Sequence, residues 1–334
     1  PTWVLADRIG IRKVILMTLA ISMVSAFVFA IAGSWQMATL AMALSGITWI
    51  IDRTVCPMIC GSILASHERV TGMGICDTIS FFPQLIAPII GATLITYFGG
   101  MNQQGIRPLY YLQIIGYAIA FIIILLKFEN PRSRRGRKSE NSILQDLTTV
   151  FREGKLVPRW IILTMLNGFP YQVMFYIPLF AAQVKGADQF IIGGMSTAST
   201  IVFVFLAIPL GHMSDNYGRK KMSTITAVLV AISYIVLVWA PNNYVLLLSS
   251  FLNGFTMSVI QNQMAIGVDL VPAEHLGSWY GILGFVRGIS GIIAPLACGY
   301  LWDLVSPSSV FYLLAVVQIV AMGVLLTVPT EITR

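Results

Sequence analysis

The sequence contains 334 residues, of which 57% are hydrophobic and only 10% are charged, and its mean hydropathy is +0.81. A soluble domain carries about 25% charged residues, so this composition excludes a soluble protein and indicates a polytopic membrane protein. The net charge of +7 is explained by the placement of the basic residues along the chain, described below.

Stretches of about 20 apolar residues can cross a bilayer as helices, and the sequence contains ten of them. They run over approximately residues 14–34, 36–63, 70–98, 109–128, 159–183, 190–212, 222–240, 243–268, 277–302 and 309–329. The predicted fold class is therefore an all-α polytopic membrane protein with ten complete spans. The chain starts at Pro1, at the end of an apolar stretch, and we expect further chain to precede it.

One long polar break interrupts the series at residues 129–158. A basic cluster opens the break, and apolar residues at helical spacing follow it. These are Arg132, Arg134, Arg135, Arg137 and Lys138, and then Ile143, Leu144, Leu147, Val150 and Phe151. We predict a cytoplasmic linker with an amphipathic helix on the inner leaflet. A solvated linker without such a helix is the alternative, and no site is assigned to it.

The distribution of Lys and Arg predicts the orientation, since cytoplasmic loops are enriched in both. Of the 21 Lys and Arg residues, 17 are predicted to lie on the cytoplasmic side or at cytoplasmic helix ends. Arg107 and Lys185 lie on the opposite side of the membrane, and Arg53 and Arg287 lie within spans. This asymmetry predicts a cytoplasmic C-terminus, and the plasma membrane is the expected location. It also explains the net charge without a nucleic-acid partner.

A loop between two spans occurs twice, at residues 3–13 and 208–221. Four pairs of residues share an offset of 208, namely Asp7 with Asp215, Gly10 with Gly218, Arg12 with Lys220 and Lys13 with Lys221. The repeat continues into the spans. Gly46 and Thr48 match Gly254 and Thr256 at the same offset, Gly74, Ala87 and Pro88 match Gly281, Ala294 and Pro295 at 207, and Glu68 matches Glu274 at 206.

The repeat predicts two six-helix halves, at residues 1–128 and 159–334, joined by the linker at 129–158. By the same offset, the first helix and most of the second helix are expected in front of Pro1. The doubled loop resembles the loop signature of the major facilitator superfamily. One departure is Trp3, which stands where the signature has a glycine, whereas Gly211 fits.

The resemblance implies that the loop aspartates bind the N-terminus of a helix from the other half and pair with basic loop residues. Such a latch would close the cytoplasmic side. The implied gating residues are Asp7, Arg8, Gly10, Arg12, Glu68, Asp215, Gly218, Arg219, Lys220 and Glu274. The alternative is that the loops only set the topology.

The stretch at 74–91 contains Gly74, Pro83, Pro88 and Gly91 and resembles the glycine-proline motif of proton-coupled drug antiporters. Pro83, Ala87 and Ala92 replace three of its glycines. Because the span at 277–302 carries a similar pattern, a shared bend is the favoured interpretation, and an antiporter motif is the alternative.

Charged side chains within spans cost about 2.5–3.5 kcal/mol each to insert and are functional candidates. Here they are Asp52, Arg53, Asp77 and Arg287. At 1.5 Å per residue, Arg53 and Arg287 lie roughly 15 Å from the cytoplasmic ends of their spans. Two arginines near the midplane favour an anionic substrate, and Asp77 and Asp52 are the candidates for proton coupling. A structural ion pair within the first half is the alternative.

Uncharged polar residues supplement these charges. The resemblance implies that the fourth, seventh and tenth helices of the complete protein line its cavity. Its candidate substrate-binding residues there are Thr48, Trp49, Asn167, Tyr171, Gln172, Thr256 and Gln261. Interhelical hydrogen bonds are the alternative role for some of them.

The sequence shows no catalytic constellation, no metal-binding spacing and no cofactor motif. The resemblance to the major facilitator superfamily implies a secondary transporter, not an enzyme, that works by alternating access and is coupled to protons. We predict a monomer that moves a small polar or anionic organic solute. Its predicted partners are the substrate, protons and membrane lipids. A proton-coupled multidrug efflux antiporter and a non-transporting solute sensor are the alternatives.

Overall fold

The computed structural model describes residues 10–63, 79–128, 156–268 and 276–329, and every regular element in these ranges is a helix. Helices are expected because no water is present in the bilayer core to satisfy backbone N–H and C=O groups. The contacts of the chain divide it into two units, Pro1–Lys138 and Ser139–Arg334. Each unit is described by itself.

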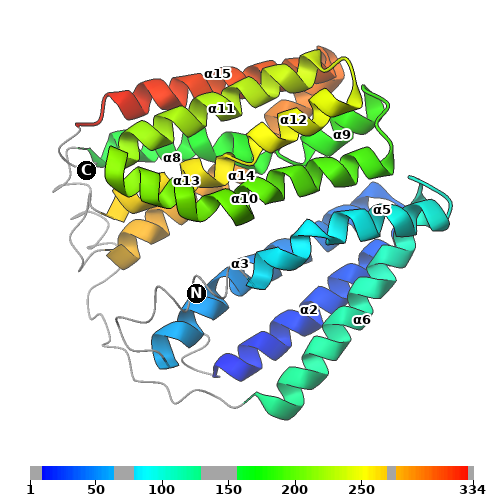
Figure 1. Ribbon diagram of the computed structural model, residues 1–334. Helices are drawn as coiled ribbons and strands as arrows, with labels where there is room; N and C mark the ends of the chain where they lie inside the picture. Colours follow the sequence, from blue (N-terminus) through cyan, green and yellow to red (C-terminus); the bar gives the residue numbers. More distant parts are fainter. Residues whose placement is uncertain (1–9, 64–78, 129–155, 269–275, 330–334) are drawn as a thin grey trace. The chain divides into compact units, whose positions relative to one another are not determined.

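The described part of the first unit contains α2 (Ile11–Ile31), α3 (Trp35–Ile63), the short 3-10 helix η1 (Phe82–Leu85), α5 (Ala87–Tyr97) and α6 (Gln103–Lys127) (Figure 1). Helix α2 packs against both α3 and α6. Small residues on its buried face, including Ser22, Ser25 and Ala26, allow this close approach. The ring of Phe29 on α2 stacks on that of Tyr110 on α6, with centroids 5.0 Å apart.

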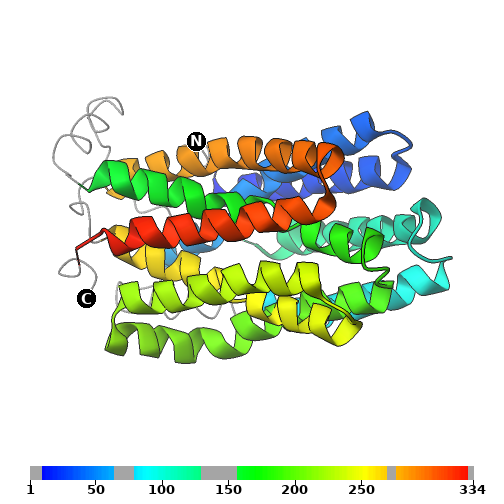
Figure 2. The same cartoon turned by 90° about the horizontal axis from the view of Figure 1, so that it is seen from above.

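The described part of the second unit is a bundle of eight helices. They are α8 (Val157–Gln172), α9 (Tyr176–Gln183), α10 (Gln189–Tyr217), α11 (Arg219–Trp239), α12 (Asn243–Asn253), α13 (Thr256–Val268), α14 (Leu276–Leu304) and α15 (Pro307–Leu326). Helix α11 packs against α15, α12 and α13, and α8 packs against α14 and α15. Figure 2 shows α14 (orange) and α15 (red) running along the bundle. Buried apolar side chains such as Phe180, Phe311 and Leu314 form its core.

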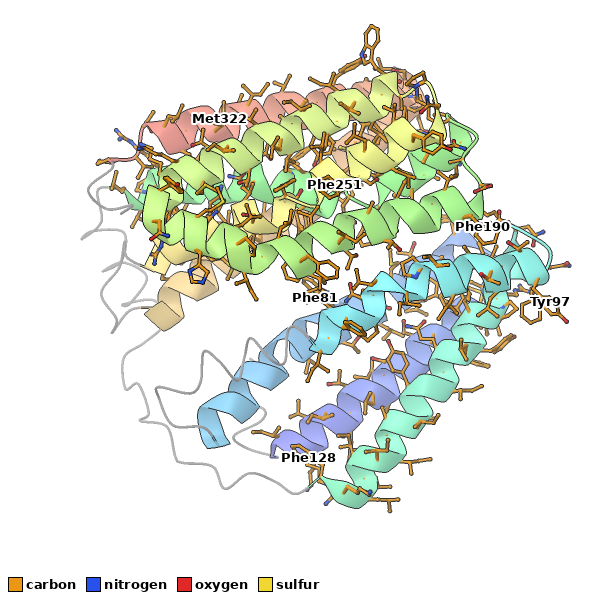
Figure 3. The ribbon with its side chains drawn as sticks, viewed as in Figure 1. Phe81, Tyr97, Phe128, Phe190, Phe251 and Met322 are labelled. Atoms are coloured by element: carbon orange, nitrogen blue, oxygen red, sulfur yellow. The ribbon has the colours of Figure 1, made fainter. Side chains whose placement is uncertain are left out.

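Seven helical segments within the described residues are long and apolar enough to cross a membrane, with most of α12 and α13 counted together as the one segment Asn243–Met264. An eighth span results if Ile79–Leu85 and Ala87–Tyr97, which meet at an angle of 41°, are counted together. The predicted span at 159–183 is divided between α8 and α9. Figure 3 shows side chains projecting all around these helices, from Phe128 after α6 to Met322 on α15. The structure therefore confirms a multi-span helical protein, while the number ten stays a prediction.

Four helices begin at a polar side chain that caps the backbone. Asn102, Asp188, Asn242 and Ser306 accept hydrogen bonds from the backbone N–H three residues further on, at the starts of α6, α10, α12 and α15. These caps satisfy N–H groups that have no partner within the helix. Helices α2 and α11 begin differently, at Gly10 and Gly218, with φ of 90° and 97°. Both glycines belong to the doubled loop, and both adopt a backbone conformation that other residues rarely adopt.

Gly218→Ala is expected to lower the stability of the protein by about 1–3 kcal/mol, because alanine at this positive φ is strained. Gly211→Ala is the matched control, since Gly211 lies within helix α10 and a Cβ there meets nothing within 4 Å. In a helix interior, alanine is favoured over glycine by about 1 kcal/mol. Thermal unfolding in detergent should therefore shift in opposite directions for the two variants. Equal shifts would contradict the conformational role of Gly218.

Candidate functional site

The doubled loops place one basic side chain in each unit at the C-terminal end of that unit's last helix. The Arg12 guanidinium donates to the carbonyl oxygen of Leu125, near the end of α6. The Lys220 ammonium donates to the carbonyl oxygen of Leu326 at 2.9 Å and to that of Val328, at the end of α15. Arg12 and Lys220 are a matched pair of the repeat, so both units use the same contact.

The same arrangement occurs at the ends of α2 and α11. Arg107 donates to the carbonyl oxygen of Ala32 at 3.5 Å, and Lys185 donates to those of Ala240 at 3.1 Å and Val238 at 2.6 Å. Ala32 and Ala240 share the offset of 208. The last carbonyls of a helix lack partners and carry a partial negative charge, so a cation stabilises them. This contact explains why basic residues stand at the two places that the predicted orientation puts on the far side.

Lys220→Met is expected to lower the stability of the protein by about 1–2 kcal/mol, because the last carbonyls of α15 lose a charged donor. Lys221→Met is the matched control on an exposed neighbouring side chain. The measurement is the midpoint of thermal unfolding in detergent. If both variants unfold at the same temperature, the hydrogen bonds of Lys220 do not contribute to stability.

The remaining predicted gating residues are described only in part. Asp7, Arg8, Glu68 and Glu274 lie outside the described residues, and Asp215 lies in α10 with a side chain that is not described. Arg219 is half-buried at the start of α11. The latch between the two halves therefore stays a prediction.

A polar contact inside each unit repeats at the offset of 208. In the first unit the hydroxyls of Ser25 and Ser45 are hydrogen-bonded at 2.7 Å. In the second unit the amide of Asn253 donates to the hydroxyl of Ser233 at 3.2 Å. These contacts join α2 to α3 and α11 to α12, so the internal repeat extends to individual hydrogen bonds.

The first unit has an open pocket of about 250 Å³ between α2, α3 and α6. It brings together Thr48, whose hydroxyl donates to the carbonyl oxygen of Ser45 at 2.9 Å, and Trp49, which is 52% exposed. Its other polar and aromatic side chains were not predicted from the sequence, and they are those of Ser22, Ser25, Phe29, Tyr110, Gln113 and Tyr117. Tyr110, Gln113 and Tyr117 are spaced so that all three lie on one face of a helix. This spacing could have identified them from the sequence.

In the second unit two predicted substrate-binding residues connect helices. The buried Asn167 on α8 accepts a hydrogen bond at 3.2 Å from the buried Gln318 on α15 and donates to the carbonyl oxygen of Leu163 at 3.0 Å. Gln172 donates to the carbonyl oxygen of Arg287 on α14 at 3.5 Å. Such interhelical bonds contribute about 1–2 kcal/mol at most. Binding of substrate by Asn167 and Gln172 stays a prediction.

The other candidates are more dispersed. Thr256 donates to the carbonyl oxygen of Asn253 at 2.7 Å, where α12 gives way to α13, and Gln261 is exposed on α13. Tyr171 and Arg287 are half-buried on α8 and α14. Asp52 and Arg53 lie in α3 with side chains that are not described, and Asp77 lies outside the described residues.

Two interrupted helices meet at a second pocket, of about 200 Å³, in the second unit. Helix α8 ends at Gln172 and α9 begins at Tyr176, while α12 ends at Asn253 and α13 begins at Thr256. Between the two breaks lies α10, which contributes Ser196 and Ser199 to the pocket. Figure 3 labels Phe251 on α12 and Phe190 near the start of α10.

Gly254, at the break between α12 and α13, permits the close approach of α10. A Cβ at this position would lie 2.5 Å from the carbonyl oxygen of Ser199 and 2.8 Å from Cβ of Val202. Its repeat partner, Gly46, has nothing within 4 Å of such a Cβ and lies within the continuous helix α3. The helix break at Gly254 therefore occurs where the chain packs closely against α10. The described part of the first unit has no such close contact at Gly46.

A family model described as the Major Facilitator Superfamily matches residues 1–196 and again residues 186–333. Among curated relatives, the tetracycline resistance protein, class B, of Escherichia coli is 28% identical over 147 residues, which cover 44% of this chain and 36% of that protein. The multidrug resistance protein MdtG of Proteus mirabilis is 28% identical over 163 residues, which cover 48% of this chain and 40% of that protein. The matched segments thus span less than half of each of these relatives.

Two solved structures share the fold. The nucleoside transporter NupG superimposes with a TM-score of 0.78 at 15% identity, over 97% of this chain and 85% of that one. The D-xylose–proton symporter superimposes with a TM-score of 0.74 at 16% identity, over 98% of this chain and 83% of that one. At these sequence identities, the similarity shows a shared fold alone.

Proposed function

The chain belongs to the Major Facilitator Superfamily, and from this premise we propose that it is a secondary transporter that moves an organic solute by alternating access. The similar proteins are named as transporters and resistance proteins rather than as enzymes. The two units would exchange between inward-open and outward-open states. A proton gradient would supply the energy, with Asp77 and Asp52 as the candidate carriers.

The first candidate substrate is a small polar or anionic organic solute, and Arg287 carries this proposal. It lies within α14, about 16 Å along the helix from Leu276 and about 9 Å from Gly281, where the segment that is long and apolar enough to span the bilayer begins. A charged residue at that depth is expensive and marks a functional site by default. A guanidinium can bind a carboxylate or phosphate through two parallel hydrogen bonds. Arg53, at a similar predicted depth in α3, would supplement it.

The second candidate function is proton-coupled efflux of drugs. The relatives named for resistance to tetracycline and to multiple drugs favour it, as does the glycine-proline pattern at 74–91. For either substrate class, Asp7 and Asp215 would take part in closing the cytoplasmic side. The protein would reside in the plasma membrane with a cytoplasmic C-terminus.

Transport assays on the full-length protein in inside-out and right-side-out vesicles test these proposals. The panel consists of organic anions, sugars and lipophilic cations, with vesicles lacking the protein as the control. Saturable movement of an organic anion or another polar solute supports the first candidate, and export of a lipophilic cation supports the second. Vesicles that move none of these solutes faster than the control would contradict both.

A further inference from the structure

We propose that the open pocket of the second unit, at the two helix breaks, binds an aromatic ring that carries N–H donors. The inference rests on the second candidate function, the efflux of drugs, and names the part of the ligand that this pocket would take. Its volume of about 200 Å³ is below the about 300–1,000 Å³ of a complete ligand site. The pocket would therefore hold one part of a larger ligand.

The backbone at both breaks departs from the α-helical pattern. After α8, the N–H of Val173 donates to the carbonyl oxygen of Pro170 at 3.2 Å, and the N–H of Tyr176 donates to that of Val173 at 2.9 Å. After α12, the N–H of Phe255 donates to the carbonyl oxygen of Leu252 at 3.3 Å. Each of these bonds spans three residues rather than four, and the N–H of Gly254 divides its bond between the carbonyl oxygens of Ser250 at 3.0 Å and Phe251 at 3.1 Å. Transporter binding sites are typically built where membrane helices are discontinuous, and here two such places border one pocket.

Two hydroxyl groups of the pocket, those of Ser196 and Ser199, use their protons within α10 and face a ligand as acceptors. Ser199 donates its proton to the carbonyl oxygen of Ser196 at 2.9 Å, and Ser196 donates to that of Ile192 at 3.3 Å. A hydroxyl has one proton and two lone pairs, so each oxygen keeps acceptor capacity after its proton is used. A ligand that meets these oxygens is bound best when it brings N–H donors.

The apolar part of the pocket suits an aromatic ring. Phe175 is 69% exposed and Met174 is 40% exposed, while Met195 is buried behind them. Thioethers contact aromatic rings favourably and adapt to irregular shapes, and the exposed face of Phe175 can stack on a ring or bind a cation. The described residues that line this pocket include no charged side chain, so donors and ring shape, rather than charge, should determine what binds.

The test compares two aromatic monocations, ethidium, which carries amino N–H donors, and tetraphenylphosphonium, which carries none. Binding to the purified full-length protein is measured by fluorescence for ethidium and with a radiolabel for tetraphenylphosphonium. Ser199→Ala should weaken ethidium binding by about 3- to 10-fold, the loss of one hydrogen bond, and leave tetraphenylphosphonium binding unchanged. Thr200→Val is the matched control, because Thr200 donates to the same carbonyl oxygen of Ser196 at 2.9 Å but does not line the pocket.

Phe175→Ala should weaken the binding of both probes, because it removes the aromatic face. The proposal is overturned if neither probe binds the wild-type protein, if Ser199→Ala and Thr200→Val affect ethidium equally, or if Phe175→Ala leaves both affinities unchanged. Export of ethidium by wild-type vesicles together with unchanged binding in both pocket variants would reject the pocket alone. An absence of any export would reject the efflux function itself.

Discussion

Replacing Arg287 with glutamine is expected to reduce the transport of an anionic substrate by about 10- to 100-fold, because the charged hydrogen bonds between the guanidinium and the substrate are lost. Glutamine keeps a polar side chain but removes the charge and the paired donors. The contact of Gln172 with Arg287 involves the backbone carbonyl oxygen of Arg287, so the variant retains the acceptor that joins α8 to α14. Initial rates in proteoliposomes are measured at matched amounts of protein.

Arg159→Gln is the control for this experiment, because it makes the same chemical change at an exposed position in the first turn of α8. It should transport at the normal rate. Transport of the anion by Arg287→Gln at the wild-type rate would show that Arg287 has a structural role. A similar loss for an uncharged substrate would also contradict anion recognition.

Asp77→Asn is expected to abolish accumulation of substrate against a gradient while allowing exchange across the membrane. Asparagine is neutral and similar in shape to a protonated aspartate, so the variant should cycle without carrying a proton. By sequence, Asp77 lies about 10 Å into its span, where an ionisable side chain indicates a proton or ion pathway. The accumulation ratio should fall to about one, the value at which no gradient is coupled to transport.

Asp52→Asn is the control, since it removes the other carboxylate that the sequence places within the spans of the first half. Counterflow exchange and uphill uptake are measured on both variants. Uphill, proton-dependent transport by Asp77→Asn would remove Asp77 as the carrier. If Asp52→Asn alone loses accumulation, the coupling role belongs to Asp52.

The sequence predicted features that depend on local conformation or on the repeat. Gly10 and Gly218, which the sequence identified as repeat partners in the doubled loop, both have positive φ in the structure, a conformation that residues other than glycine rarely adopt. The membrane spans could be predicted from the sequence because a helix that crosses the bilayer has to be long and apolar. Both features require only the residues of one segment.

The features that sequence did not predict depend on contacts between distant segments. Gly46 and Gly254 are repeat partners, yet only Gly254 stands at a helix break, and it lies against α10. Asn167 and Gln318 share a hydrogen bond across 151 positions. The caps provided by Lys185 and Lys220 likewise involve carbonyl groups more than 50 positions away. Pattern and spacing do not specify which helices become neighbours at these points.

Uptake into proteoliposomes with an imposed pH difference and no nucleotide tests whether a proton gradient drives transport. The full-length protein is reconstituted alone, and accumulation of the best solute of the panel is followed before and after a protonophore is added. We expect the solute to accumulate above its external concentration and the accumulation to collapse when the pH difference is removed. Equilibration without accumulation, at every direction and size of the pH difference, would contradict proton-coupled secondary transport.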